Sequence, residues 1–234
     1  MRRDTPRGRT LLHALHRHAV RPRRSAALRA RARELYRHAI LAAAERIFAR
    51  SGFTGTRMAD VAAEAGLATG TLYNYFANRD ALLSSLIERR SEELLAAVRT
   101  AAEGAGADEP RAILLSMLRT SFQYLEAHRA LFAALQGATG ISGRQMASIN
   151  RRCVESQRSY HAIIADVLGR AIRAGRVRAD VPTSVLVDFL TGAAHGVMRA
   201  WMARNAGAAG AEQPLVDRAA DVVDLFLRGA SVPS

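Results

Sequence analysis

The chain has 234 residues, of which 49% are hydrophobic and 24% charged, so it can bury a sizeable core and is too apolar to be disordered throughout. Its net charge is +13, and all 34 basic residues are arginines, which favours a polyanionic partner. Charged residues interrupt every long apolar run, which argues against a membrane span. The single cysteine, Cys153, excludes an intramolecular disulfide framework and fits a reducing compartment such as the cytoplasm.

Most of the excess positive charge lies in residues 1–33, where eleven arginines accompany one acidic residue, Asp4. Six of them directly precede the first clear helix: Arg21, Arg23, Arg24, Arg29, Arg31 and Arg33. Such a basic arm can enter the minor groove or follow the backbone of DNA. It can equally be a solvated tail, a targeting segment, or sequence upstream of the true start. The pattern leaves these interpretations open.

Beyond the arm, the apolar residues fall at helical spacing. From Glu34 they predict a first helix that ends near Arg50 and is closed by Gly52, a residue that tolerates a positive φ. A second, short helix is predicted over residues 58–65. Gly66 follows it where a left-handed C-terminal cap is wanted. The sequence therefore places a glycine after each of the first two predicted helices.

A third short helix is predicted in the segment ATGTLYNYF, and Asn78 is placed to cap a fourth. Small residues at Ala62, Ala65 and Gly66 let the second and third helices touch. Two short helices joined by a tight glycine turn are typical of the helix-turn-helix, whose second helix enters the major groove of DNA. The spacing therefore predicts a DNA-binding motif near residues 57–75.

Residues 39–88 also carry a family resemblance. The matching positions are Ala44, Phe48, Gly52, Phe53, Thr56, Val61, Ala62, Ala65, Gly66, Gly70, Thr71, Leu72, Tyr73, Tyr75 and Phe76. This run resembles the DNA-binding domain of TetR-family repressors, and the string is far more specific than a lone helix-turn-helix pattern. The resemblance implies a bacterial homodimer that binds a roughly palindromic operator, with a helical C-terminal domain that senses a small molecule.

The resemblance places the family's DNA contacts at the start of the second helix, in the third helix and at the start of the fourth. These residues are Arg57, Thr69, Gly70, Thr71, Tyr73, Asn74, Tyr75 and Arg79. The sequence departs from the family at Arg57, usually Thr or Ser, so we expect the cap to move to Thr56 and Arg57 to reach a phosphate. Ala68 replaces the usual Ser and removes one capping hydroxyl.

Each predicted contact has a structural alternative. Tyr73 is equally suited to packing, so Asn74 and Tyr75 are the stronger candidates for DNA contacts. Arg57 and Arg79 can instead be solvated surface charges. These alternatives concern the individual side chains and leave the motif itself unchanged.

After a breaker at residues 103–110, helices are predicted near 111–127, 129–137, 143–174, 182–204 and 213–229. No segment has the period of two that a strand requires. The predicted fold class is all-α, with an N-terminal helix-turn-helix domain followed by a helical ligand-binding and dimerisation domain. The predicted divisions are a basic arm over 1–33, a DNA-binding domain over 34–80 and the helical domain over 81–234.

Apolar, aromatic and polar residues of the helical domain are candidates for a ligand pocket, with an ordinary core as the alternative. They are Met117, Phe122, Tyr124, Met146, Gln157, Tyr160 and His161. The last two helices have the position of the family's dimerisation helices. Small and apolar residues there predict a dimer interface, with burial inside one subunit as the alternative: Val185, Phe189, Gly192, Gly196, Val222, Leu225 and Phe226.

The sequence has no catalytic triad, paired carboxylates, phosphate-binding loop or zinc signature, so we expect neither an enzyme nor a cofactor or metal site. The expected partners are double-stranded DNA, a second copy of the chain and an unidentified small-molecule inducer, without a membrane. Two functions stay open. One is a ligand-responsive repressor of the bacterial cytoplasm, and the other is a constitutive basic nucleic-acid-binding protein without an inducer.

Overall fold

A computed structural model describes residues 21–104, 109–136, 143–205 and 213–230. Its helices run in the order α2 (Arg21–Gly55), α3 (Met58–Glu64), α4 (Thr69–Tyr73), α5 (Arg79–Gly104), α6 (Pro110–Ala127), α7 (Arg129–Gln136), α8 (Gly143–Arg173), α9 (Thr183–Arg204), η1 (Leu215–Asp217) and α10 (Arg218–Ala230). No strand occurs in these ranges, and the predicted all-α class is confirmed. None of these helices is long and apolar enough to cross a membrane.

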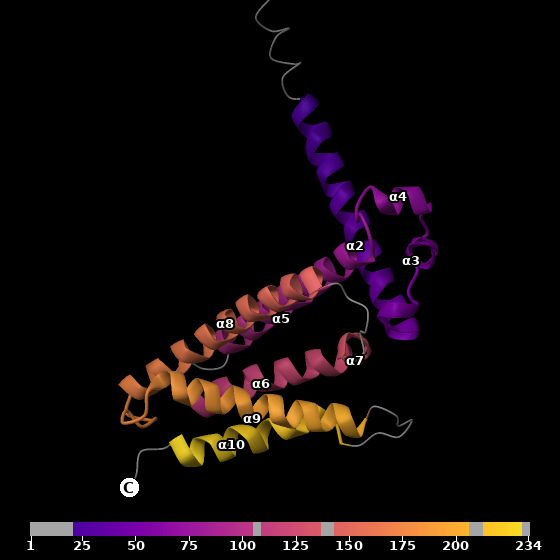
Figure 1. Cartoon of the computed structure of the whole chain (residues 1–234). Helices are drawn as coiled ribbons and strands as arrows, with labels where there is room; N and C mark the ends of the chain where they lie inside the picture. The colour runs from indigo at the N-terminus through magenta and orange to yellow at the C-terminus, as the bar shows by residue number, and fades with distance from the viewer. Residues whose placement is uncertain (1–20, 105–108, 137–142, 206–212, 231–234) are drawn as a thin grey trace, which may run out of the picture.

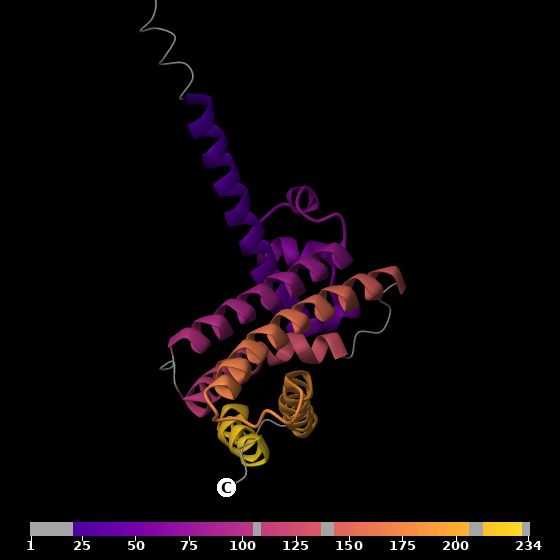
Figure 2. The ribbon, with the colours of Figure 1, turned by 90° about the vertical axis from the view of Figure 1, so that its left-hand side faces the viewer.

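Two hydrophobic cores organise the chain. The first, in the DNA-binding unit, joins α2, α3, α4, the first half of α5 and Leu131 of α7. The second joins the other half of α5 to α6, α8, α9 and α10. Helix α5 therefore belongs to both cores, and the predicted boundary at residue 80 lies in its first turn. Figures 1 and 2 show α5 alongside α8, with α9 and α10 at the far end of the molecule.

Helix α2 is longer than the sequence pattern indicated. It begins at Arg21, so the residues assigned to the end of the arm continue into the first helix without a break. Alanine, leucine and arginine dominate this stretch and have high helix propensity. Pro22 stands in the first turn, where its missing N–H leaves no helical hydrogen bond unmade. The N-terminal half of α2 projects beyond the rest of the molecule in both views (Figures 1 and 2).

The predicted turns are confirmed. Gly52 and Gly66 have φ of 65° and 68°, in the left-handed region that favours glycine. After Gly66, the Leu67 amide donates to the Ala62 carbonyl at 2.9 Å and so closes α3. The Asn78 side chain accepts a hydrogen bond from the Ala81 amide at 2.8 Å and caps α5.

The predicted cap at Thr56 is wrong. Its hydroxyl donates to the Gly52 carbonyl at 2.7 Å, which ties it to the end of the preceding helix. The residue before α3 is Arg57, and no side chain caps this helix. Thr56 is buried, so its hydroxyl needs a hydrogen-bond partner within the protein. The Gly52 carbonyl, at the kink in α2, is that partner.

Candidate DNA-binding surface and ligand cavity

Helix α4 is held on the DNA-binding core by its apolar side. Leu72 and Phe76 are fully or almost fully buried, as are Val61 and Ala62 of α3 against which this turn packs. Leu72 is thus the residue of α4 that enters the core, and the helix leaves Thr69, Gly70 and Tyr73 exposed. Its N-cap residue is Ala68, and as expected no side-chain hydroxyl caps it.

The predicted DNA contacts differ in their exposure to solvent. The exposed residues are Arg57, Thr69, Gly70, Tyr73 and Asn74, and the half-buried ones are Thr71, Tyr75 and Arg79. Tyr73 is 50% exposed and so is the more accessible tyrosine. Tyr75, which the sequence favoured, packs against the core with its ring 6.2 Å from that of Tyr36 in α2. The packing alternative therefore fits Tyr75 better than Tyr73.

Arg79 has a structural role that sequence reasoning missed. Its Nη1 donates to the carbonyls of Phe53 and Thr54 at 2.9 Å and of Thr56 at 3.3 Å. The guanidinium also lies 4.1 Å from the centre of the Phe53 ring. Arg79 thus satisfies three carbonyls around the turn between α2 and α3. Because Arg79 is the first residue of α5, these hydrogen bonds also hold the start of α5 against this turn.

Two further arginines brace the back of the motif. Arg46 and Arg50 of α2 bind the Glu64 carboxylate at 2.6 and 2.8 Å. These hydrogen bonds lower the pKa of Glu64 below its ordinary range. They join α2 to the end of α3.

A cavity of about 330 Å³ lies between α5, α6, α8 and α9, with Phe132 of α7 at its edge. Its walls are largely apolar, with Leu94, Leu118 and Met198 among them. It brings together Phe122, Gln157, Tyr160 and His161, four of the predicted ligand residues. A larger hollow of about 670 Å³ lies between α5 and α8 and is lined partly by arginine and carboxylate side chains.

The other three ligand candidates have different outcomes. Met117 is 1% exposed and belongs to the core behind the cavity. Tyr124 does not line the cavity, because its hydroxyl is held by Glu93. The Met146 side chain lies outside the described residues.

Neutral hydrogen-bonding groups stand on the cavity wall. The Ser121 hydroxyl donates to the Met117 carbonyl at 2.9 Å and lies 3.0 Å from the Tyr160 hydroxyl, which therefore donates to it. Burial raises the pKa of Tyr160 and keeps it neutral. His161 has Nδ1 3.8 Å from Asp188, while its buried Nε2 has no partner among the described residues. The cavity therefore offers polar contacts without a lysine, arginine or carboxylate among its described lining residues.

The predicted dimer interface divides into two groups. Val185, Phe189 and Leu225 are 51%, 66% and 69% exposed on α9 and α10. A Cβ atom built at Gly192 or Gly196 would meet nothing within 4 Å, so the protomer itself does not require glycine there. The predicted interface role of Val222 and Phe226 is wrong. They are 5% and 3% exposed and belong to the core of the single chain.

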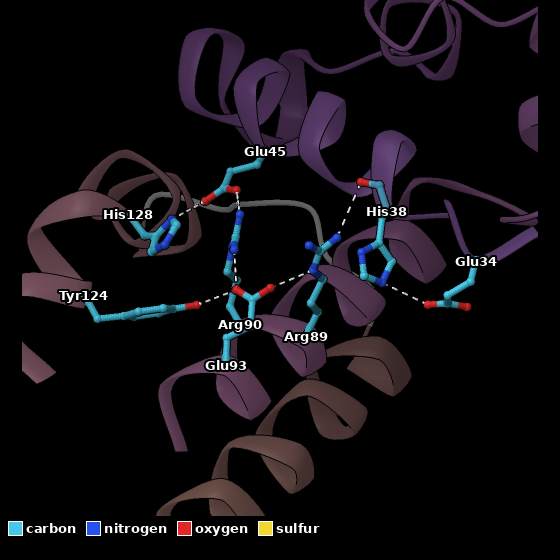
Figure 3. A network of polar contacts seen from close by, with 8 residues as sticks. All are labelled: Glu34, His38, Glu45, Arg89, Arg90, Glu93, Tyr124 and His128. Carbon is cyan, nitrogen blue, oxygen red and sulfur yellow. Dashed lines mark hydrogen bonds and ion pairs between the residues drawn. The ribbon is translucent and has the colours of Figure 1, made fainter. Parts of the chain in front are cut away.

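A polar network joins the two parts of the chain (Figure 3). Arg90 of α5 binds Glu45 of α2 and Glu93 one turn farther along its own helix. Glu45 also contacts His128 Nδ1 at 2.7 Å, and Tyr124 of α6 donates to Glu93 at 3.0 Å. Sequence reasoning missed this network because no motif links acids and bases so far apart in the chain.

The network shifts the acidity of its members. Burial alone would raise the pKa of Glu93, but hydrogen bonds from Arg89, Arg90 and Tyr124 outweigh it and lower this pKa. Burial and the neighbouring Glu93 both raise the pKa of Tyr124. At neutral pH, Glu93 is therefore a carboxylate and Tyr124 a neutral donor.

Two family profiles match this chain. Residues 40–86 match the family described as "Bacterial regulatory proteins, tetR family". Residues 109–229, more than half of the chain, match "Transcriptional regulator SbtR-like, C-terminal domain". The first match covers the helix-turn-helix with its flanking helices, and the second covers α6 to α10.

Characterised relatives and solved structures agree with these matches. The chain is 26% identical to the HTH-type transcriptional repressor KstR2 of Mycobacterium tuberculosis over 64% of its length and 74% of that protein. It is also 26% identical to the HTH-type transcriptional regulator UidR of Escherichia coli, over 68% and 78% of the two chains. The structure of the transcriptional regulator FadR from Bacillus subtilis in complex with stearoyl-CoA shares the fold, with a TM-score of 0.68, 20% identity and coverage of 82% and 98%.

These relatives are transcriptional regulators rather than enzymes. The matched regions together contain the exposed recognition helix and the helices that surround the cavity. The chain belongs to the TetR family of DNA-binding transcriptional regulators.

Proposed function

We propose that this protein is a homodimeric repressor that binds a roughly palindromic operator and leaves it when a small molecule fills the cavity. One observation carries the proposal: α4 is fixed by buried Leu72 and Phe76, while Thr69, Tyr73 and Asn74 stand exposed on its outer side. A rigid helix with outward polar groups is what a major-groove reader requires.

Individual roles follow from the chemistry of the exposed groups. The Asn74 amide can both donate to and accept from a base edge, whereas Thr69 and Tyr73 offer hydroxyls to bases or phosphates. Arg57 is exposed one residue before α3 and is suited to a phosphate. Gly70 has open space where a Cβ would stand, so the DNA backbone can approach it closely.

The exposed faces of α9 and α10 support the dimer. Val185, Phe189 and Leu225 present large apolar side chains to solvent, and Gly192 lets another helix approach between them. A two-fold pairing of these helices would bury this surface and place two copies of α4 on one duplex. The symmetry of the dimer would then require an inverted repeat in the operator.

The cavity supports a mainly apolar ligand with a neutral or weakly polar group. Its volume of about 330 Å³ falls within the range of small-molecule sites, and its lining is mostly aliphatic and aromatic. The unpaired Nε2 of His161 and the Gln157 amide can orient a polar end. The FadR structure with stearoyl-CoA shows that this fold can hold a ligand with a long apolar chain.

The polar network offers a route from ligand to DNA. Leu94 of the cavity wall directly follows Glu93 in α5, and Phe122 and Leu125 flank Tyr124 in α6. A ligand that moves either helix would therefore shift the groups that hold Glu45 of α2. This would change the placement of the DNA-binding unit, and affinity for the operator would fall if the ligand binds the shifted conformer more tightly.

Binding to DNA that flanks the coding region, with excess random-sequence competitor at physiological salt, tests the proposal. We expect a selective complex that Asn74→Ala weakens roughly tenfold through loss of a base or phosphate contact. Gln123→Ala, an exposed amide on α6, serves as the control and should bind like the wild type. Equal displacement by any DNA would instead support the constitutive basic binder.

A further inference from the structure

The N-terminal half of α2 carries exposed arginines beyond the DNA-binding core. Residues 26–36 are exposed on nearly every face, yet they continue the same helix that packs into the core from Ile40 onward. Figure 1 shows this half of α2 extending past α4. This half of α2 is thus a helical projection beside α4, the helix proposed to enter the major groove.

Two contacts fix how the projection is rotated relative to α4. The Tyr36 ring lies 6.2 Å from that of Tyr75, just after α4. The Arg37 guanidinium lies 5.0 Å from the centre of the Phe76 ring, and its Nη2 donates to Ser85 of α5 at 3.1 Å. The face of α2 that bears Tyr36 and Arg37 is therefore turned toward the end of the recognition helix.

Arg33 and Arg29 occupy this same face. Arg33 lies three and four residues before Tyr36 and Arg37, and Arg29 lies one turn earlier. At about 1.5 Å of rise per residue, they stand about 4.5 Å and about 10 Å beyond Tyr36 along the helix. Arg31, two residues from each, points to the other side.

We propose that Arg29 and Arg33 form a second DNA-binding surface, which grips the phosphate backbone outside the half-site that α4 reads. The major groove is about 12 Å wide, so the phosphate backbone borders α4 when this helix is seated in the groove, and long cationic side chains on the adjoining face of α2 can reach that backbone. Guanidinium groups match phosphate oxygens in charge and geometry. Contiguity with α4 favours DNA over an anionic membrane as the partner. The inference rests on the proposed function, because it assumes that α4 occupies the groove.

The test compares Arg33→Gln with Arg31→Gln, which remove the same charge from opposite sides of one helix. Affinity of the full-length protein is measured between low and physiological salt, on a long operator duplex and on one trimmed at the half-site ends. Because each phosphate contact contributes about 0.9 to the salt slope, Arg33→Gln should lower the slope of a dimer by about 1.8 on the long duplex. It should weaken binding there roughly tenfold, with little effect on the trimmed duplex. Arg31→Gln should match the wild type on both.

Other outcomes overturn the inference in distinguishable ways. Equal losses of affinity in the two variants would indicate that only the general positive charge of α2 matters. Unchanged affinity in Arg33→Gln would show that Arg33 does not contact DNA. In both cases the proposed function stands if the wild type still selects its operator. Loss of selectivity by the wild type itself would overturn both proposals. Binding to phosphatidylglycerol vesicles is measured in parallel. If Arg33→Gln weakens vesicle binding but leaves DNA binding unchanged, the surface binds membranes instead. Circular dichroism spectra and melting temperatures of both variants check that α2 still folds.

Discussion

The DNA-binding unit and the helical domain gather their functional residues differently. In the first, Arg57 and the exposed residues of α4 all come from one short segment of the chain. In the second, five helices contribute to the cavity, and its polar groups come from residues as distant as Ser91 and His195. A surface built from one segment is readable in the sequence, whereas a cavity depends on how separate helices pack. Substitutions in each region can test this difference.

Adjacent residues of α10 should separate protomer stability from self-association. Phe226→Ala removes a buried ring and should lower the free energy of unfolding by about 3–5 kcal/mol. Leu225→Ala alters an exposed side chain, so it should change protomer stability by less than about 0.5 kcal/mol and instead weaken the dimer. Urea unfolding and sedimentation velocity, each over a range of protein concentrations, measure the two effects. Equal effects on unfolding would contradict this division of α10.

Arg90 should couple the two regions. Arg90→Ala leaves the carboxylates of Glu45 and Glu93 without their shared partner, and the partly buried position suggests a loss of about 2–3 kcal/mol. Thermal unfolding should then split into two transitions as the DNA-binding unit separates from the helical domain. Arg111→Ala, which breaks an exposed pair with Asp224, is the control and should leave the free energy of unfolding nearly unchanged. A single unshifted transition in Arg90→Ala would show that the network does not couple the regions.

Filling the cavity should affect ligand binding more than DNA binding. Ala194→Phe places a ring among the lining residues and should weaken binding of the neutral apolar dye Nile red roughly tenfold, by occupying its space. Fluorescence titration measures this. Ala179→Phe, at an exposed position between α8 and α9 that lines neither hollow, should leave dye binding unchanged. Equal dye binding by both variants would place the dye outside this cavity.

Acid should weaken the link between the regions. The hydrogen bonds that lower the pKa of Glu93 in the folded protein stabilise the fold at pH above its ordinary value of 4.5. This contribution is lost as the pH falls through the lowered folded value. Glu93→Gln should therefore show a flatter decline of melting temperature below pH 4.5 than the wild type, and an identical decline would contradict the role of this carboxylate.

Sequence patterns predicted local features well. The glycines at 52 and 66, the Asn78 cap and the outward face of α4 each depend on neighbours a few residues away. They could not distinguish the exposed Phe189 from the buried Phe226, because amphipathic spacing does not say which apolar face meets its own chain. The patterns also could not show that Tyr124 belongs to the polar network rather than the cavity, because its partner Glu93 lies 31 residues away in the sequence.

In the proposed dimer, the exposed residues of the two copies of α4 read the same DNA sequence twice. Selection of bound duplexes from a randomised library, at physiological salt, tests it most directly. We expect enrichment of an inverted repeat whose half-site centres lie about one helical turn or a multiple of it apart, and loss of that enrichment in Asn74→Ala. A library that emerges without an enriched sequence, although DNA is bound, would contradict it.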